Sequence, residues 1–395
     1  MNYNFATRIG GLKPSAIREI LKVTQDPSVI SFAAGNPAPE AFPAKEMKLI
    51  ADELFEKKAA SALQYGVSEG YTPLRELTAK RLKEKYNIGT PDDDLIILSG
   101  GQQVMDLTAK CFLNEGDTIL VENPSFIGAL NCFRSYGARL VGIPMEPDGV
   151  DIGALEHALA TEKNVKLMYL IPTFQNPTGR VMSLSKRLAV LELSKRYNVP
   201  ILEDNPYYEL RYSGEYVPTI KSLDTDGRVI YAGSYSKILS PGIRLGFVCA
   251  NKEVISKLVV TKQVSDVHTN LFFQMIAAEY ITRYSLDDHI AEVCDIYRKK
   301  RDAMADALSR YCGDTLRFDA PEGGLFLWCD IKSGRDGKEL CLISGRKGVA
   351  AVPGVAFAMD PESIVPAIRL NFSLPTYDQI DRGCRLLGES ARELG

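Results

Sequence analysis

Short apolar runs alternate with amphipathic segments between residues 95 and 250, and this alternation restricts the possible folds more than any other feature of the chain. Each run has the length and composition of a buried strand. The runs cover residues 95–98, 118–121, 139–143, 165–171, 199–202, 228–232 and 245–250. Strands that alternate with helices predict an α/β fold with a mostly parallel sheet between two layers of helices. Ligands of such folds bind at the carboxyl ends of the strands.

Polar residues follow three of these predicted strands. Asn176, Asp204 and Lys237 each come at or shortly after the end of one strand. Because the carboxyl ends of parallel strands converge, we expect the three side chains to meet. Taken singly, Asn176 and Asp204 are more simply explained as turn residues beside prolines. Their coincidence with Lys237 favours a shared site over separate turns.

The segment 233–247 that contains Lys237 joins two predicted buried strands. An ammonium is almost never buried without a partner, and desolvation lowers the pKa of a lysine toward that of a nucleophilic amine. Ser234, Ser236 and Arg244 supply the donors that a phosphate monoester requires. A Schiff-base lysine beside a phosphate site suggests pyridoxal 5'-phosphate (PLP). The alternative is a solvated lysine in a loop between strands.

A glycine turn, which includes Gly101 and Gln102, leads from the first predicted strand into a helix. The free N–H groups and the dipole at a helix N-terminus favour a bound anion. Such turns are also common without a ligand. This turn therefore supports an anion site only in combination with the residues around Lys237.

The pattern changes after residue 250 to long helices and then to a mixture of strands and helices, which predicts a small α+β domain. Arg369 lies inside an apolar strand of this part, where a charge needs an anionic partner. A structural ion pair and a ligand carboxylate are both candidates. We expect an N-terminal segment that contributes to the small domain and the substrate pocket, a large cofactor-binding domain and a small C-terminal domain, over residues 1–45, 46–285 and 286–395.

Composition excludes several classes of function. The net charge is −3 and charges of both signs are interspersed, so we expect no nucleic-acid and no membrane partner. The longest apolar runs are far too short to span a membrane. The 8 cysteines contain no Cys-x-x-Cys pair and the 3 histidines are dispersed, which predicts no metal site, no disulfide framework and a reducing, cytoplasmic location.

Four motifs resemble those of fold-type I PLP-dependent aminotransferases of class I/II. They begin at Asn176 (NPTG), Asp204 (DNPY), Ser234 (SYSK, continuing to Arg244) and Ile368 (IRLNF). The resemblance covers essentially the whole chain and implies a large domain with a sheet of the seven-stranded type. Three N-terminal motifs are similar to the 2-aminoadipate aminotransferase branch, which includes LysN and kynurenine aminotransferase II. These motifs are IREIL from residue 17, SFAAG from residue 31 and LQY from residue 63.

The resemblance implies a role for each matching residue. Lys237 would be the Schiff-base lysine and would move a proton between substrate and cofactor, and Asp204 would pair with the protonated pyridine nitrogen. Tyr207 and Asn176 would bond the phenolic oxygen of the cofactor. Phe126 matches the position of an aromatic ring that stacks on the cofactor, which is usually tyrosine.

The same resemblance implies how phosphate and substrate are bound. The phosphate ligands would be Gly101, Gln102, Ser234, Ser236 and Arg244, with Tyr65 from a partner subunit; close relatives often have serine where this chain has Gly101. Arg369, assisted by Asn176, would bind the substrate α-carboxylate through a bidentate contact, and Gly35 would lie against the substrate backbone. Arg18 would meet a distal carboxylate, or would be a solvated arginine on a short helix.

The implied function is that of a homodimer with shared active sites. It would move the amino group of a 2-aminoadipate, aromatic or branched-chain L-amino acid to 2-oxoglutarate by a ping-pong mechanism. One alternative is a carbon–sulfur β-lyase on the same fold. Another is a PLP-binding regulatory domain, which would carry an N-terminal winged helix that we do not expect here. Two candidate carboxylate-binding arginines favour a dicarboxylate acceptor, and hence transamination.

Overall fold

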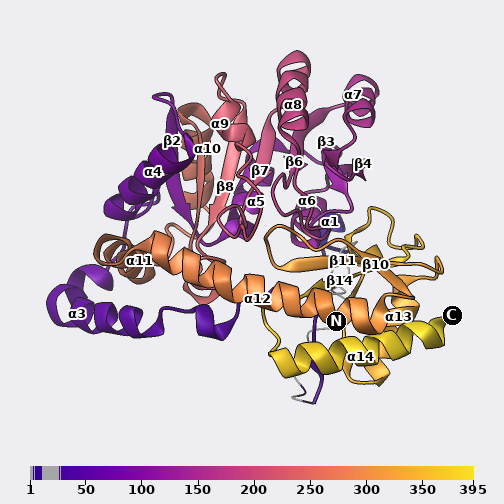
Figure 1. Cartoon of the computed structure of the whole chain (residues 1–395). Coiled ribbons are helices and arrows are strands. Elements are labelled where there is room, and N and C mark those ends of the chain that lie inside the picture. The colour runs from indigo at the N-terminus through magenta and orange to yellow at the C-terminus, as the bar shows by residue number, and fades with distance from the viewer. Residues whose placement is uncertain (1–2, 4, 11–25, 27) are drawn as a thin grey trace.

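The computed structural model describes all residues except 1–2, 4, 11–25 and 27. Arg18 and the short helix predicted from residue 14 lie outside the described residues. The largest sheet has eight strands in the order β2-β9-β8-β7-β6-β3-β4-β5 (Figure 1). The strands are β2 (Asp93–Leu98), β3 (Thr118–Asn123), β4 (Arg139–Glu146), β5 (Gly149–Val150), β6 (Val165–Leu170), β7 (Ile201–Asp204), β8 (Val229–Ser234) and β9 (Gly246–Asn251).

The five central strands of this sheet are parallel. β4, β3, β6, β7 and β8 pair in parallel, whereas β9 and β2 continue the sheet as antiparallel strands. The predicted mostly parallel, seven-stranded type of sheet is therefore confirmed, and the two-residue β5 adds a short eighth strand beside β4. The loop that carries Lys237 joins two antiparallel neighbours, β8 and β9.

Helices cover both faces of the sheet. One face packs against α5 (Gly101–Phe112), α6 (Ile127–Ser135) and α10 (Lys252–Gln263), and the other against α7 (Ile152–Thr161), α8 (Leu184–Tyr197) and α9 (Ile220–Leu223). Ser183 caps α8 by accepting a hydrogen bond from the backbone N–H of Lys186. The other helices of this part are α1 (Thr7–Gly10), α3 (Ala44–Ala62), α4 (Thr72–Tyr86) and α11 (Leu271–Arg283).

A second, antiparallel sheet forms the smaller unit, as predicted for the C-terminal part. Its strands are β10 (Leu316–Phe318), β11 (Phe326–Ile331), β14 (Ala367–Asn371) and β13 (Val352–Pro353), in that order. Its helices are α13 (Gly337–Arg346) and α14 (Tyr377–Leu394), and the long α12 (Leu286–Cys312) leads into it and packs along α14 (Figure 1). The N-terminal segment joins this unit, because β1 (Ile30–Ser31) pairs with β12 (Val349–Ala350).

β7 begins two residues later than predicted. Pro200 has no N–H to donate to a neighbouring strand, and the amide of Val199 bonds the carbonyl of Ser194 at the end of α8. Strand pairing therefore starts at Ile201 and runs to Asp204. As a result Asp204 is the last residue of the strand, and the sheet fixes the direction of its side chain.

Two further sequence predictions concern the state of the cysteines and membrane-spanning segments. All eight cysteines are free thiols, as predicted. Within the described residues, no helix combines the length and the apolar character that crossing a membrane requires.

Candidate active site

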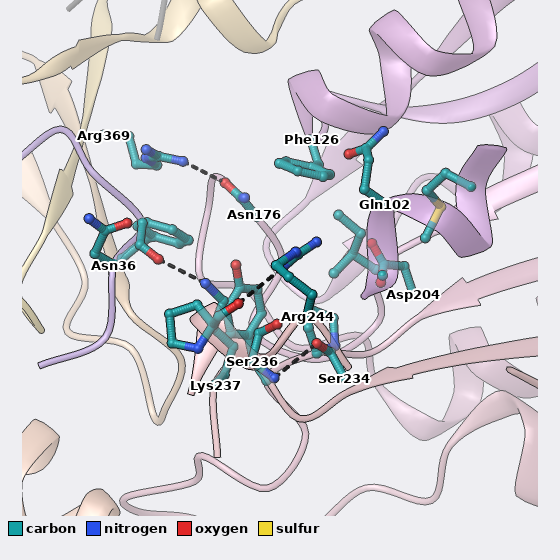
Figure 2. A pocket seen from close by; sticks show the side chains of 18 residues that line it. Asn36, Gln102, Phe126, Asn176, Asp204, Ser234, Ser236, Lys237, Arg244 and Arg369 are labelled. Atoms are coloured by element: carbon teal, nitrogen blue, oxygen red, sulfur yellow. Dashed lines mark hydrogen bonds between the residues drawn. The ribbon is translucent and has the colours of Figure 1, made fainter. Parts of the chain in front are cut away.

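A cavity of about 290 Å³ lies at the carboxyl ends of β6, β7 and β8 (Figure 2). Of the predicted site residues that the structure describes, it gathers all except Tyr65. The predicted residues that line it are Gly35, Gly101, Gln102, Phe126, Asn176, Asp204, Tyr207, Ser234, Ser236, Lys237, Arg244 and Arg369. Residues more than 300 positions apart thus share one cavity. The expectation that the polar strand ends converge is correct.

Lys237 faces the cavity from the loop after β8, and its Nζ donates a 2.8 Å hydrogen bond to the carbonyl of Gly35. Burial of the ammonium, together with the nearby guanidinium groups of Arg369 and Arg244, lowers the pKa of Lys237 to about 8. A lysine with this pKa has a substantial fraction of neutral amine near neutral pH. Such an amine can attack a carbonyl carbon and can accept a proton.

Asp204 is 7% exposed and forms no ion pair within the part of the chain that the structure describes. The Tyr169 hydroxyl donates a 2.7 Å hydrogen bond to its Oδ2. Burial raises the pKa of Asp204 to about 6, while the hydrogen bond from Tyr169 acts in the opposite direction. A buried carboxylate that lines a cavity without a cation is suited to a ligand that brings a positive charge.

Arg369 is a buried cation with no carboxylate partner among the described residues. Its Nη1 donates to Oδ1 of Asn176 at 3.0 Å and its Nη2 to the carbonyl of Ala33 at 2.7 Å, while its buried Nε has no partner (Figure 2). The rings of Phe326 and Phe357 lie 4.1 Å and 4.8 Å from its guanidinium carbon. Burial lowers its pKa to about 10, which still leaves it charged at neutral pH. It is therefore available to an anionic ligand.

The anion end of the cavity is built from the N-terminus of α5 and the loop after β8. Arg244 donates to the carbonyls of Ser99 (3.1 Å) and Pro241 (3.3 Å), and the amide of Ser236 donates to Oγ of Ser234 at 3.1 Å. A Cβ on Gly101 would meet no atom within 4 Å, so this position is open and offers its backbone N–H to a ligand. Together these groups offer neutral and cationic donors to an anion.

The neighbouring Gly100 allows Arg244 to approach the backbone at the anion end of the cavity. It has a φ of +83°, and a Cβ there would lie 2.5 Å from Nη2 of Arg244. Only glycine satisfies both the backbone conformation and the close approach of the arginine.

Comparison with known proteins agrees with this geometry. The family model described as aminotransferase class I and II matches residues 27–387. The chain belongs to this family. The enzyme is 43% identical over 393 residues to aromatic-amino-acid aminotransferase 1 of Thermococcus litoralis, and the match covers 98% of this chain and 94% of that relative.

Two solved structures resemble this aminotransferase closely. A kynurenine aminotransferase of Pyrococcus horikoshii is 40% identical, with a TM-score of 0.94 over 98% of this chain and 97% of the other. LysN, the α-aminoadipate aminotransferase of Thermus thermophilus, is 35% identical, with a TM-score of 0.91 over 99% of this chain and 97% of the other. LysN was crystallised with N-(5'-phosphopyridoxyl)-L-leucine. This chain is accordingly a PLP-dependent transaminase of fold type I.

The residues of the aminotransferase cavity fit PLP. Donors for a phosphate stand at the N-terminus of α5, and Asp204, which lacks a cation, faces the same cavity as Lys237 (Figure 2). Phe126 can lie against the cofactor ring, because a Cβ on Gly128 would lie 2.4 Å from its Cζ and glycine there leaves room for the phenyl group. Tyr207 adds a buried phenol whose pKa is raised, so it stays a neutral donor.

The structure does not bring Tyr65 into the cavity of its own chain. Its side chain is 81% exposed and its ring meets His268 edge-on at 5.7 Å. This position is compatible with the predicted contribution to a neighbouring subunit, which stays a prediction. The role of Arg18 also stays a prediction.

Sequence reasoning missed several lining residues, namely Asn36, Met105, Ile171, Pro206, Pro241 and Phe326. It also missed Tyr169, behind the cavity. Phe326 is the first residue of an apolar run and is buried, so its composition does not separate it from core residues. For Tyr169 the available signal was a hydroxyl inside the apolar run of residues 167–171, since a buried phenol needs a partner.

Proposed function

We propose that this aminotransferase moves the amino group of an L-amino acid to 2-oxoglutarate by a ping-pong mechanism, with both half-reactions in the cavity around Lys237. One observation carries the proposal: Arg369, a buried arginine without a carboxylate partner in the described chain, lines the same cavity as a lysine whose pKa is lowered to about 8. An α-amino acid and a 2-oxo acid share a carboxylate next to the reacting carbon. One arginine can therefore orient both substrates in turn.

Each cavity residue has a role in this proposal. Bound PLP supplies the electron sink that makes the substrate Cα–H acidic. Arg369, with Asn176, holds the α-carboxylate, and Lys237 carries the proton from and to the substrate Cα. Asp204 holds the proton on the ring nitrogen of the cofactor, and Tyr207 donates to its ring oxygen.

The remaining residues bind and orient the cofactor. Phe126 stacks on its ring, and Gly35 lies along the substrate backbone. The phosphate ligands are Gly101, Gln102, Ser234, Ser236, Arg244 and, from a partner subunit, Tyr65. Gly100 supports this arrangement, because it lets Arg244 approach the backbone at the start of α5.

The amino donor is of the aromatic, 2-aminoadipate or branched-chain type. The relatives named above support this range, and so does the ring of Phe326, which lines the cavity and lies over the guanidinium of Arg369. We assign recognition of a distal carboxylate to Arg18. Arg18→Ala should raise KM for glutamate and 2-aminoadipate much more than for leucine or phenylalanine, and equal effects on both groups would remove this role.

The proposed assembly is a homodimer in the cytoplasm. An apolar surface supports association of two copies: Phe55 packs on Phe272 at 4.9 Å, and Phe55, Leu63, Tyr65 and Val67 are all more than half exposed. Free thiols support a reducing compartment. The proposed domain limits at residues 45 and 285 are supported by the separate four-stranded sheet and by the two-stranded sheet in which the N-terminal β1 pairs with β12.

A single-turnover screen tests the reaction. The PLP-loaded enzyme is mixed with one amino acid at a time, and loss of the absorption band of the lysine-bound cofactor is followed together with release of the 2-oxo acid. Conversion by glutamate and by at least one aromatic, branched-chain or 2-aminoadipate donor supports transamination. Release of pyruvate and ammonia from a cysteine thioether, with no conversion by the other amino acids, would instead support the β-lyase alternative.

A further inference from the structure

Tyr169 is a fully buried tyrosine of the large sheet whose hydroxyl reaches the cofactor-facing carboxylate of Asp204 at 2.7 Å. It stands opposite Leu202 in the parallel pair of β6 and β7, and Asp204 lies two residues further along β7. Since side chains alternate along a strand, Tyr169 and Asp204 point to the same face of the sheet. The Tyr169 ring packs edge-on against Phe133 of α6 at 5.4 Å. Both ends of the tyrosine are therefore fixed.

The two oxygens of Asp204 differ in their surroundings. Oδ2 accepts the hydrogen bond from Tyr169, whereas no described residue donates to Oδ1. Asp204 lines the cavity, but Tyr169 does not. The bond at Oδ2 thus sets the plane of the carboxylate and the direction of its unoccupied oxygen.

The hydrogen bond also affects the charge of Asp204. Burial raises the pKa of this carboxyl to about 6, and the bond from Tyr169 lowers it. The other titratable groups around it are Glu122 on β3 and Tyr207 after β7. Burial raises the pKa of Glu122 to about 8 and that of Tyr207 above its usual range. Both neighbours are therefore largely neutral near pH 7, and the hydrogen bond from Tyr169 favours the ionised form of Asp204.

We propose that Tyr169 is a positioning residue for the cofactor: its hydroxyl orients the Asp204 carboxylate so that the unoccupied oxygen receives the N–H of the PLP ring. The inference rests on the role of Asp204 in the proposed function. It adds a residue that acts through Asp204 without lining the cavity.

The test compares PLP with its 1-deaza analogue, in which carbon replaces the ring nitrogen and leaves Asp204 nothing to bond. Dissociation constants of both ligands are measured for the apoenzyme forms of the wild type, Tyr169→Phe, Asp204→Asn and the double variant. Phenylalanine keeps the ring that packs on Phe133. We expect Tyr169→Phe to weaken PLP binding roughly tenfold or more and to leave binding of the analogue unchanged. In the Asp204→Asn background, Tyr169→Phe should cause no further loss.

Tyr136→Phe is a matched control, because it removes a phenol–carboxylate hydrogen bond of 2.8 Å to Asp106, and neither residue lines the cavity. It should lower Tm and leave both dissociation constants unchanged. Equal weakening of both ligands by Tyr169→Phe, or no weakening of PLP, would overturn the inference while the role of Asp204 stands. If Asp204→Asn itself weakens the two ligands equally, the role of Asp204 fails, and this inference fails with it.

Discussion

The guanidinium of Arg369 donates a 3.0 Å hydrogen bond to the amide oxygen of Asn176, which precedes it by 193 positions. This contact joins β14 of the small sheet to the loop after β6 of the large sheet. The group proposed to hold the substrate carboxylate and a group proposed to hold the cofactor ring are therefore one hydrogen-bonded unit. A substitution of Arg369 or Asn176 should therefore change the binding of both the substrate and the cofactor.

Arg369→Lys should lower kcat/KM roughly a hundredfold, mainly through a higher KM, because an ammonium cannot form the two parallel bonds that a guanidinium forms with a carboxylate. The loss should be similar for amino acids and 2-oxo acids, which share that group. Steady-state kinetics on both substrate classes measure it. Arg187→Lys is the control: Arg187 is as deeply buried but bonds carbonyls outside the cavity, so its loss should lower Tm and leave KM unchanged.

Lys237→Met should abolish the borohydride-reducible link between protein and PLP and lower turnover by about a thousandfold or more. Peptide mapping of the reduced protein identifies the linked residue. Lys262→Met is the matched control, since Lys262 also has a buried side chain but pairs with Asp266 outside the cavity. A reducible adduct that persists in Lys237→Met, or that disappears in the control, would contradict the assignment.

The attachment of PLP to the apoenzyme should depend on pH with a midpoint near 8. Below the pKa Lys237 is protonated and cannot attack the aldehyde, so the rate of attachment rises with pH through about 8, well below the ordinary lysine value of about 10.4. Burial is the main cause of the low pKa, and the positive charge of Arg369 adds to it. Arg369→Gln should accordingly move the midpoint upward. Rates of adduct formation, trapped with borohydride over a pH series, provide the measurement; a midpoint near 10 in the wild type would count against the burial argument.

Arg244→Gln should weaken binding of PLP roughly tenfold to a hundredfold and leave binding of pyridoxal, which has no phosphate, unchanged. The reason is that Arg244 is the cationic donor at the anion end of the cavity, where it bonds the carbonyls of Ser99 and Pro241. Titration of the apoenzyme with each ligand separates the two effects. Equal losses for both ligands would show that the substitution disturbs the ring site.

Gly100→Ala should destabilise the fold by about 1–2 kcal/mol through its positive φ and should also weaken PLP binding by displacing Arg244. Gly116→Ala provides the comparison, because Gly116 has a similar φ of +86° with no atom within 4 Å of a Cβ. That variant should lose stability to a similar extent and keep its affinity for PLP. Thermal unfolding and titration of both variants check the prediction.

The sequence predicts the site well because the reactive and polar side chains of the site lie at or just after strand ends. Lys237 and Asn176 lie in loops and Asp204 closes a strand, so their polar side chains interrupt apolar runs and are visible without coordinates. The parallel sheet then brings these ends together. For the same reason the strands of the large sheet that were predicted lie within a few residues of their predicted limits.

The sequence does not distinguish functional side chains that are apolar or aromatic from ordinary core residues. Phe326 and Tyr169 stand inside apolar strands, and their relation to the site depends on which face of which sheet they occupy. Pairing between strands sets that face, and it follows from contacts distant in sequence. The proposed contribution of Tyr65 to a partner subunit involves a second copy of the chain, so contacts within one chain do not reveal it.

The packing around Arg369 also gives the molecule an optical reporter. Trp328 is the only tryptophan of the chain, stands opposite Arg369 in the β11–β14 pair, and packs edge-on at 6.3 Å against Phe357, the ring that covers the guanidinium. A carboxylate that binds Arg369 changes the electric field at the indole. Intrinsic fluorescence excited near the tryptophan band therefore follows occupation of the substrate site with no added label, and it does so from a position that the chemistry itself does not use.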